Sequence, residues 1–139
     1  MNLFSRRKDL AAQNFLLKLV NNNCPGRSAL LEGPRTDSRV NLTVVVWIVP
    51  IENGQLQTSQ AFTAVTKDFS SNGAAVVLDR PRGLDQAVLG FFFEGEMVFL
   101  RAQAKHLNPM GGGFFQLGFQ MLEIVSIADY PKLASIGLQ

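Results

Sequence analysis

The dipeptide Asn53-Gly54 constrains the fold of this 139-residue chain more than any other short feature. Both residues tolerate the positive φ angles of the tight turn that joins two antiparallel strands. The β-branched stretch VNLTVVVWIV (residues 40–49) precedes the dipeptide, and LQTSQAFTAVT (residues 56–66), with rough alternation, follows it. Both stretches are typical of strands. We therefore expect an antiparallel hairpin that turns at residues 53–54.

Further strand and turn signals follow along the chain. In order they are the turn SSNG (70–73), the strand AAVVL (74–78), a loop (79–86), one long or two short strands interrupted at Glu94-Gly95 (88–107), the turn NPMGGG (108–113) and a last strand (114–124). Five to seven short strands with little helix indicate a small antiparallel barrel or sandwich. Eleven phenylalanines supply a large apolar area for its core, and the run FFF at residues 91–93 is typical of a strand buried on both faces.

Residues 5–21 are predicted to form a helix, with Ser5 as N-cap and an apolar set at near-helical spacing, namely Leu10, Phe15, Leu17 and Val20. We expect this helix to cover one end of the domain; the alternative is a membrane-surface or partner-binding helix. Residues 126–135 can form a short C-terminal helix, although Pro131 lies inside it. The expected organisation is an N-terminal helix and loop (1–30), a β-barrel domain (31–127) and a C-terminal tail (128–139).

Charge and cysteine content narrow the class of protein. The net charge is +2, but residues 1–40 carry seven Lys or Arg against three Asp or Glu. This excess is too small for bulk nucleic-acid binding, so we expect neither DNA nor RNA, and it suits a small anionic ligand. A single cysteine, Cys24, forms no internal disulfide, and the longest apolar run (42–51) is about half a membrane span. We expect a cytoplasmic protein without a membrane span.

The hairpin connects two polar stretches that are distant in sequence. A two-residue turn at 53–54 sets residue 39 opposite residue 68 and residues 40–49 opposite residues 58–67, with Pro50 or a bulge able to shift the register slightly. The stretches PRTDSR (34–39) and DFSSNG (68–73) are thus expected at the same end of the sheet.

The residue types in these two stretches suit guanine-nucleotide recognition. Arg35 and Arg39 can grip phosphate, donate to guanine or stack on it. Asp68 and Ser70 can accept hydrogen bonds from the N1–H and N2–H groups of guanine. Gly73 is expected to allow a positive φ and close approach of a ligand. Each motif alone is weakly specific, and the plain alternative is an Arg–Asp surface pair beside a turn.

Together the motifs resemble those of the PilZ domain family, receptors for cyclic di-GMP. RTDSR, with Arg35 and Arg39, looks like the family's RxxxR, and DFSSNG, with Asp68, Ser70 and Gly73, looks like its [D/N]xSxxG. The resemblance covers about residues 35–124. It implies a mainly β fold with a six-stranded antiparallel barrel, and a cyclic di-GMP site in which the two arginines contact phosphates and guanine while Asp68 and Ser70 contact guanine. Pro34, which precedes the first arginine, leaves open whether one or two ligands bind.

The leading functional hypothesis is therefore a cyclic di-GMP receptor that passes ligand binding to an effector protein through ordering of the loop at 24–39. The alternative is a PilZ-like interaction module that binds no nucleotide and uses the helix at 5–21 as its surface. We expect that the protein is not an enzyme and that it binds neither a cofactor nor a metal, because the chain shows no nucleophile elbow, Walker loop or zinc-ligand spacing. A monomer or weak homodimer is expected.

Overall fold

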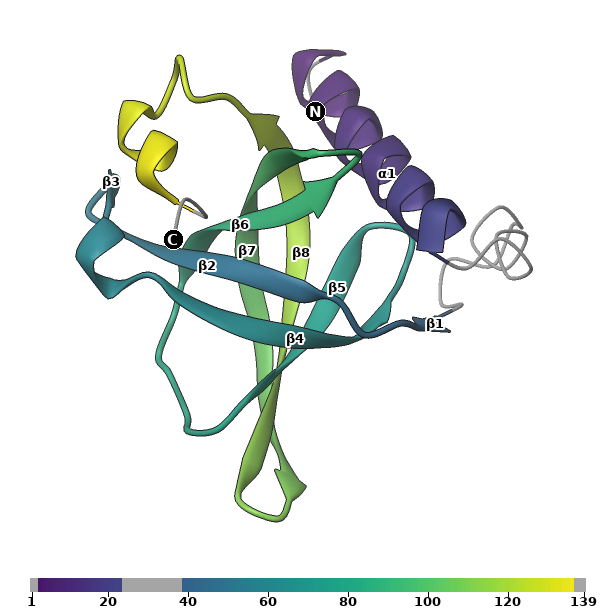
Figure 1. The fold of residues 1–139 in the computed structure, drawn as a ribbon, viewed down its shortest axis with the longest axis vertical. Coiled ribbons are helices and arrows are strands. Elements are labelled where there is room, and N and C mark those ends of the chain that lie inside the picture. The colour runs from purple at the N-terminus through teal and green to yellow at the C-terminus, as the bar shows by residue number, and fades with distance from the viewer. Residues whose placement is uncertain (1–2, 24–38, 137–139) are drawn as a thin grey trace.

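The structure is a computed structural model that describes residues 3–23 and 39–136 (Figure 1). One helix precedes a single antiparallel sheet, and the order along the chain is α1 (Leu3–Asn23), β1 (Val40–Asn41), β2 (Val45–Glu52), β3 (Gln55–Leu56), a 3₁₀ helix (Thr58–Gln60), β4 (Phe62–Phe69), β5 (Gly73–Leu78), β6 (Gln86–Phe93), β7 (Glu96–Gly111), β8 (Phe114–Val125) and a second 3₁₀ helix (Pro131–Ser135). The expected mainly β fold with an N-terminal helix is confirmed, and the C-terminal helix is a short 3₁₀ segment.

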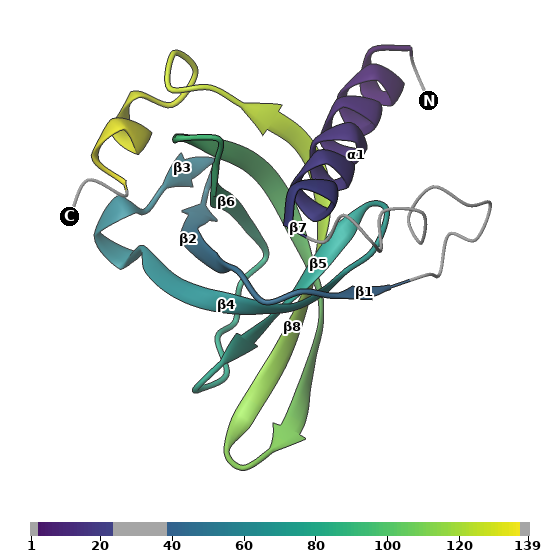
Figure 2. The ribbon, with the colours of Figure 1, turned by 45° about the vertical axis from the view of Figure 1, so that its right-hand side comes forward.

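Six of the strands close into a ring (Figure 2). Neighbours pair antiparallel in the order β4-β5-β8-β7-β6-β2, and pairing of β2 with β4 completes the circle. The two remaining strands are short extensions, since β1 pairs with β4 and β3 pairs with β2. Closure leaves the ring strands with few free edges, which limits edge-to-edge aggregation.

Helix α1 belongs to the same core as the ring. Phe15 and Leu16 are buried in the main apolar cluster, and the ring of Phe15 packs against Phe91 at 6.2 Å and against Phe93, edge to face, at 5.5 Å. Lys8 adds an ion pair of 3.3 Å to Glu123 on β8. The helix thus covers one end of the ring, as expected from its sequence (Figure 1).

Details of the helix prediction are wrong. The helix begins at Leu3, two residues before Ser5, so Ser5 is not its N-cap. Leu10 is 57% exposed and Leu17 is only partly buried, whereas Ala12, Leu16 and Leu19 line the buried face together with Phe15 and Val20. Four apolar residues at near-helical spacing did not fix which side of the helix meets the ring.

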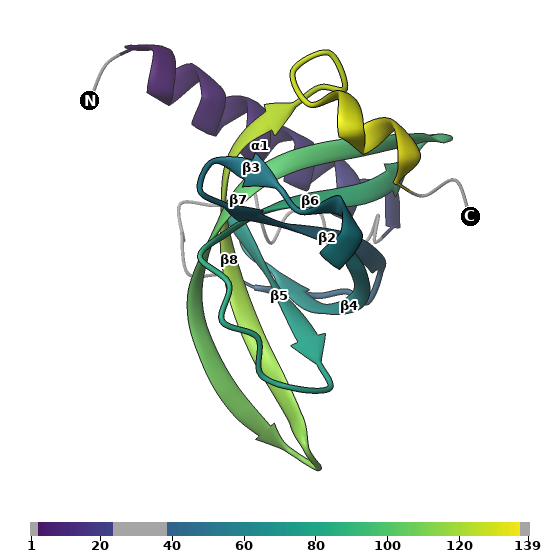
Figure 3. The same ribbon diagram turned by 90° about the vertical axis from the view of Figure 1, so that its left-hand side faces the viewer.

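The C-terminal 3₁₀ helix covers a second, smaller apolar cluster (Figure 3). Leu133 and Ile136 pack there with Val49, Val88 and Phe99, which β2, β6 and β7 contribute. These strands are therefore buried on both faces over part of their length. The run FFF behaves differently, because Phe91 is buried while Phe92 is exposed. The prediction that this run is buried on both faces is wrong for Phe92.

The hairpin turn is confirmed, but the register beyond it differs from the prediction. Asn53 and Gly54 have φ angles of 53° and 75°, and Ile51 pairs with Leu56 as a two-residue turn requires. The 3₁₀ helix Thr58–Gln60 then inserts extra residues, so that Trp47 pairs with Thr63 rather than with Gln60. The stretch 56–66 is therefore divided between β3 and β4 instead of forming one strand.

The stretch 40–49 is likewise divided, and Thr66 marks the break. Its buried hydroxyl donates to the Leu42 carbonyl (2.7 Å) and accepts from the Val44 N–H (2.9 Å). Between the end of β1 and the start of β2, this side-chain hydroxyl thus takes the place of ladder hydrogen bonds to β4. The pairing with β4 shifts by one residue at the same point. This local arrangement fixes where the chain leaves β1 for β2.

Replacing Leu16 with alanine should lower the free energy of unfolding by about 2–4 kcal/mol, because the residue is fully buried between α1 and the ring. Leu10→Ala is the matched control, and its cost should stay within about 0.5 kcal/mol since Leu10 is exposed. Urea unfolding followed by circular dichroism measures both. Equal, small costs would show that α1 does not share the core.

Candidate ligand-binding site

The start of β1 and the end of β4 form a charged corner. Arg39 Nη1 donates to Asp68 Oδ1 at 2.8 Å, and Lys67 Nζ donates to Asp68 Oδ2 at 3.1 Å. The backbone partner of Asp68 is Asn41 rather than Arg39, so the arginine reaches its carboxylate diagonally along the strand pair. Arg39 and Asp68 are therefore adjacent, as predicted, although the predicted residue-to-residue register is wrong.

Burial differs sharply between the members of this corner. The Asp68 side chain is 4% exposed, whereas the side chains of Arg39 and Lys67 are 56% and 43% exposed. A buried carboxylate requires compensation, which the two cations provide from the solvent side. Because Lys67 holds one oxygen, Arg39 can leave the other without stranding an uncompensated charge.

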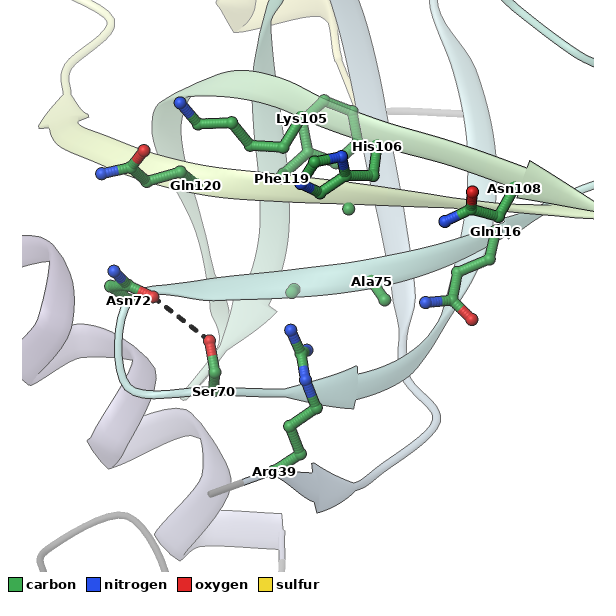
Figure 4. A pocket seen from close by; sticks show the side chains of 12 residues that line it. Arg39, Ser70, Asn72, Ala75, Lys105, His106, Asn108, Gln116, Phe119 and Gln120 are labelled. Carbon is green, nitrogen blue, oxygen red and sulfur yellow. Dashed lines mark hydrogen bonds between the residues drawn. The ribbon is translucent and has the colours of Figure 1, made fainter. Parts of the chain in front are cut away.

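The turn Ser70–Asn72 continues this corner into a hollow on the outer face of the ring (Figure 4). The buried Ser70 donates its hydroxyl to Asn72 Oδ1 at 3.3 Å, and its N–H donates to the Gly73 carbonyl at 3.0 Å. The Asn72 carbonyl accepts from the Met121 N–H of β8 at 2.8 Å. These bonds hold the turn against the sheet, with Ser70 and Asn72 lining the hollow.

Gly73 is required here for a reason that differs from the expectation. The glycines with positive φ in the described residues are Gly54, Gly95 and Gly111–Gly113, and Gly73 is not among them. A Cβ at Gly73 would instead clash with the carbonyl oxygen of Phe119 and lie 3.3 Å from its carbonyl carbon. The glycine therefore permits close approach of β5 to β8, not a left-handed turn.

The hollow has a volume of about 600 Å³. Its floor is formed by residues with little or no side chain, Ala75 and Gly118, which pair across β5 and β8. Its walls are polar and carry Arg39, Ser70, Asn72, Lys105, His106, Asn108, Gln116 and Gln120. The described lining includes two cations and no carboxylate, so its electrostatic character favours an anionic ligand.

Sequence reasoning missed most of these walls. On β8, Gln116, Gly118 and Gln120 alternate with the buried Leu117, Phe119 and Met121, and this alternation was a usable signal for an outward polar row. Lys105 and His106 carry no such signal, because their placement depends on a bulge in β7. His106 lies in β7 and is exposed.

Some residues of the two polar stretches and of the neighbouring loops do not enter the description of the hollow. Pro34, Arg35 and Cys24 fall outside the described residues, so the site is described here with Arg39 alone of the two motif arginines. Arg82 does not line the hollow; its guanidinium lies 3.7 Å from the ring centroid of Phe62 in a separate groove. The loop at residues 79–85 therefore contributes no residue to the lining of the hollow.

The described residues give no sign of a metal site or of a membrane-spanning helix. Residues 3–23 and 39–136 contain no group of three or more side chains that could hold a metal ion. Within the same ranges, no helix is long and apolar enough to cross a membrane.

Comparison with known proteins supports the fold. No family model and no curated protein matches the chain. Among solved structures, the chain is similar to the inhibitor of motility MotI/DgrA of Bacillus subtilis, with a TM-score of 0.52 and 17% sequence identity over 73% of this chain and 48% of that one. The chain spans about half the length of that protein. At this identity the likeness supports a PilZ-like fold.

Replacing Gly73 with alanine should lower the free energy of unfolding by about 1–3 kcal/mol, because the added methyl group meets the backbone of β8. Gly118→Ala is the matched control, since the nearest atom to its added Cβ is the His106 carbonyl oxygen at 4.0 Å. Differential scanning calorimetry should show a clear loss of Tm for the first variant and little change for the second. Equal Tm values would contradict the steric role of Gly73.

Proposed function

We propose that this chain is a receptor for cyclic di-GMP with a single PilZ-like domain. The observation that carries the proposal is that Arg39 and Ser70 line one corner of a hollow whose described lining is cationic and amide-rich, and that Arg39 is bound there to the buried Asp68. Cyclic di-GMP offers two phosphates for the cations and two guanines for the acceptors. The PilZ-like fold and the paired sequence motifs support the same ligand.

Asp68 must exchange donors for this ligand to bind as proposed. Its two oxygens accept from Arg39 and Lys67, and its side chain is almost fully buried. We propose that the N1–H and N2–H groups of guanine take the place of Arg39 at Oδ1. The released guanidinium then turns to a phosphate or stacks on the base, which a half-exposed side chain can do without repacking the core. Lys67 keeps the carboxylate compensated throughout.

The hollow favours one ligand per chain. A volume of about 600 Å³ lies within the usual range for a site that encloses one small molecule. A stacked pair of dinucleotides would need additional walls, which Arg35 and its neighbours would have to supply. The stoichiometry of a titration decides between these cases.

The turn that follows Asp68 also provides a route from the site to α1. Ser70 and Asn72 face the hollow, while Ser71, between them, lines a small cavity with Gln13, Asn14 and Leu17 of α1. A ligand that moves this turn would change its contact with the helix. We propose that an effector protein reads this change together with the ordering of the loop at 24–39.

The alternative function is an interaction module that binds no nucleotide, and one observation favours it. Arg39, Lys67 and Asp68 already satisfy one another, as a purely structural ion cluster would. In that case α1 is the partner surface, with the exposed Leu10 as its apolar contact. Deletion of α1 would uncover Phe91 and Phe93 of β6, against which Phe15 packs, so Leu10→Glu is the sharper test of partner capture.

Isothermal titration calorimetry of the purified chain with cyclic di-GMP tests the receptor function. The wild-type chain should bind with a stoichiometry near one, and the double variant Arg35→Ala/Arg39→Ala should lose at least about a hundredfold in affinity, because each arginine supplies charge-assisted hydrogen bonds. The matched control is Arg80→Ala/Lys132→Ala, which also removes two exposed cations but spares the hollow.

Two results would contradict the receptor function. The first is absence of binding by the wild-type chain at tens of micromolar ligand. The second is equal affinity for the wild type and the motif double variant, which would show that any bound nucleotide lies elsewhere.

A further inference from the structure

A β-bulge in β7 gives the hollow a second cationic wall. Ala104 pairs with Phe119 and His106 pairs with Gly118, so Lys105 is an extra residue between two adjacent pairs. In a regular strand, successive side chains point to opposite faces. The bulge suspends this alternation, and both Lys105 and His106 line the hollow.

This wall lies across the hollow from the Arg39 corner (Figure 4). The strands run in the order β4-β5-β8-β7, so three strand spacings separate the Asp68 strand from the bulge. At about 4.8 Å per spacing this amounts to roughly 14 Å. One phosphate group spans much less than this distance, so we expect the two cationic walls to hold different anionic groups.

The surroundings of Lys105 leave its charge available to a ligand. The residue is exposed and forms no ion pair with any carboxylate in residues 39–136, whereas Lys67 and Arg101 in the same part of the chain are paired. In Figure 4 the Lys105 amine extends toward the side of the hollow where Gln120 lies, whose amide group can donate or accept. Between the two walls, Ala75 and Gly118 leave space for a ligand above the sheet, because their side chains are small or absent.

We propose that Lys105 binds the second phosphate of the cyclic dinucleotide, while Arg39 serves the first. This inference rests on the receptor function proposed above and adds a specificity-determining residue to it. The bulge then makes the site selective for a ligand with two separated phosphates, because a mononucleotide can satisfy only one wall. Gly118 contributes to the same selectivity, because a side chain at this position would stand between the two halves of the ligand.

The test is a double-mutant cycle in cyclic di-GMP affinity, measured by calorimetry for the wild type, Arg39→Ala, Lys105→Gln and the combined variant. Lys105→Gln should weaken binding about ten- to a hundredfold through loss of a charge-assisted contact. The fold losses of the two single variants should multiply in the combined variant, because separate phosphates make the contacts independent. Lys132→Gln, a lysine outside the hollow, should bind like the wild type.

Gly118→Ala gives an independent measurement, since it adds a methyl group to the floor without a steric conflict in the fold. It should weaken binding at least fivefold with an unchanged Tm. Wild-type affinity in Lys105→Gln would overturn the inference while leaving the receptor function intact. The inference would also be overturned if the combined variant bound cyclic di-GMP as tightly as the single variant with the lower affinity, because both cations would then serve one phosphate. Absence of binding by the wild type itself would instead remove the receptor function and this inference with it.

Discussion

The pairing of β2 with β4 is the interaction on which the rest of the structure depends. It closes the ring, and it places the start of β1 beside the end of β4. Thr66 completes this closure through its bonds to Leu42 and Val44, at the point where the chain leaves β1 for β2. Arg39 can reach the buried carboxylate of Asp68 only because the backbone is held in this position.

The outer face of the ring becomes a site because its floor is low and its rim is polar. Gly73 lets β5 approach β8, and Ala75 and Gly118 leave space above the two strands. The cations arrive from opposite rims, Arg39 beside β1 and Lys105 from the bulge in β7. Backbone geometry thus decides where the charge lies, and the hydrogen bond to Asp68 holds Arg39 at this corner.

Much of this architecture could be predicted from the sequence because it depends on local signals. Asn53-Gly54 fixed the hairpin, β-branched runs marked the strands, and Arg39 and Asp68 were correctly expected at one end of the sheet. The exact register could not be predicted. The 3₁₀ helix at Thr58–Gln60 interrupts a stretch whose composition is compatible with a strand, and the Thr66 hydroxyl replaces ladder bonds that a pattern of residues does not reveal.

The site was predictable only where short motifs carry it. Ser70 lines the hollow and Asp68 is bound to Arg39 at its corner, but the positive φ expected at Gly73 was wrong, because the close approach between strands that needs this glycine is a tertiary property. Lys105 escaped prediction for the same kind of reason, since a bulge depends on the partner strand as much as on its own residues. Arg35 lies outside the described residues, and its role stays a prediction.

The central claim is that a guanine dinucleotide binds on the outer face of the ring between Asp68 and the β7 bulge. Two-dimensional NMR of the ¹⁵N-labelled chain during titration with cyclic di-GMP tests this claim most directly. The account predicts that the largest amide shifts occur at Ser70, Asn72, Lys105 and Gln120. Saturating ligand that leaves these amides unchanged, or that shifts only the opposite end around Leu56 and Tyr130, would contradict it.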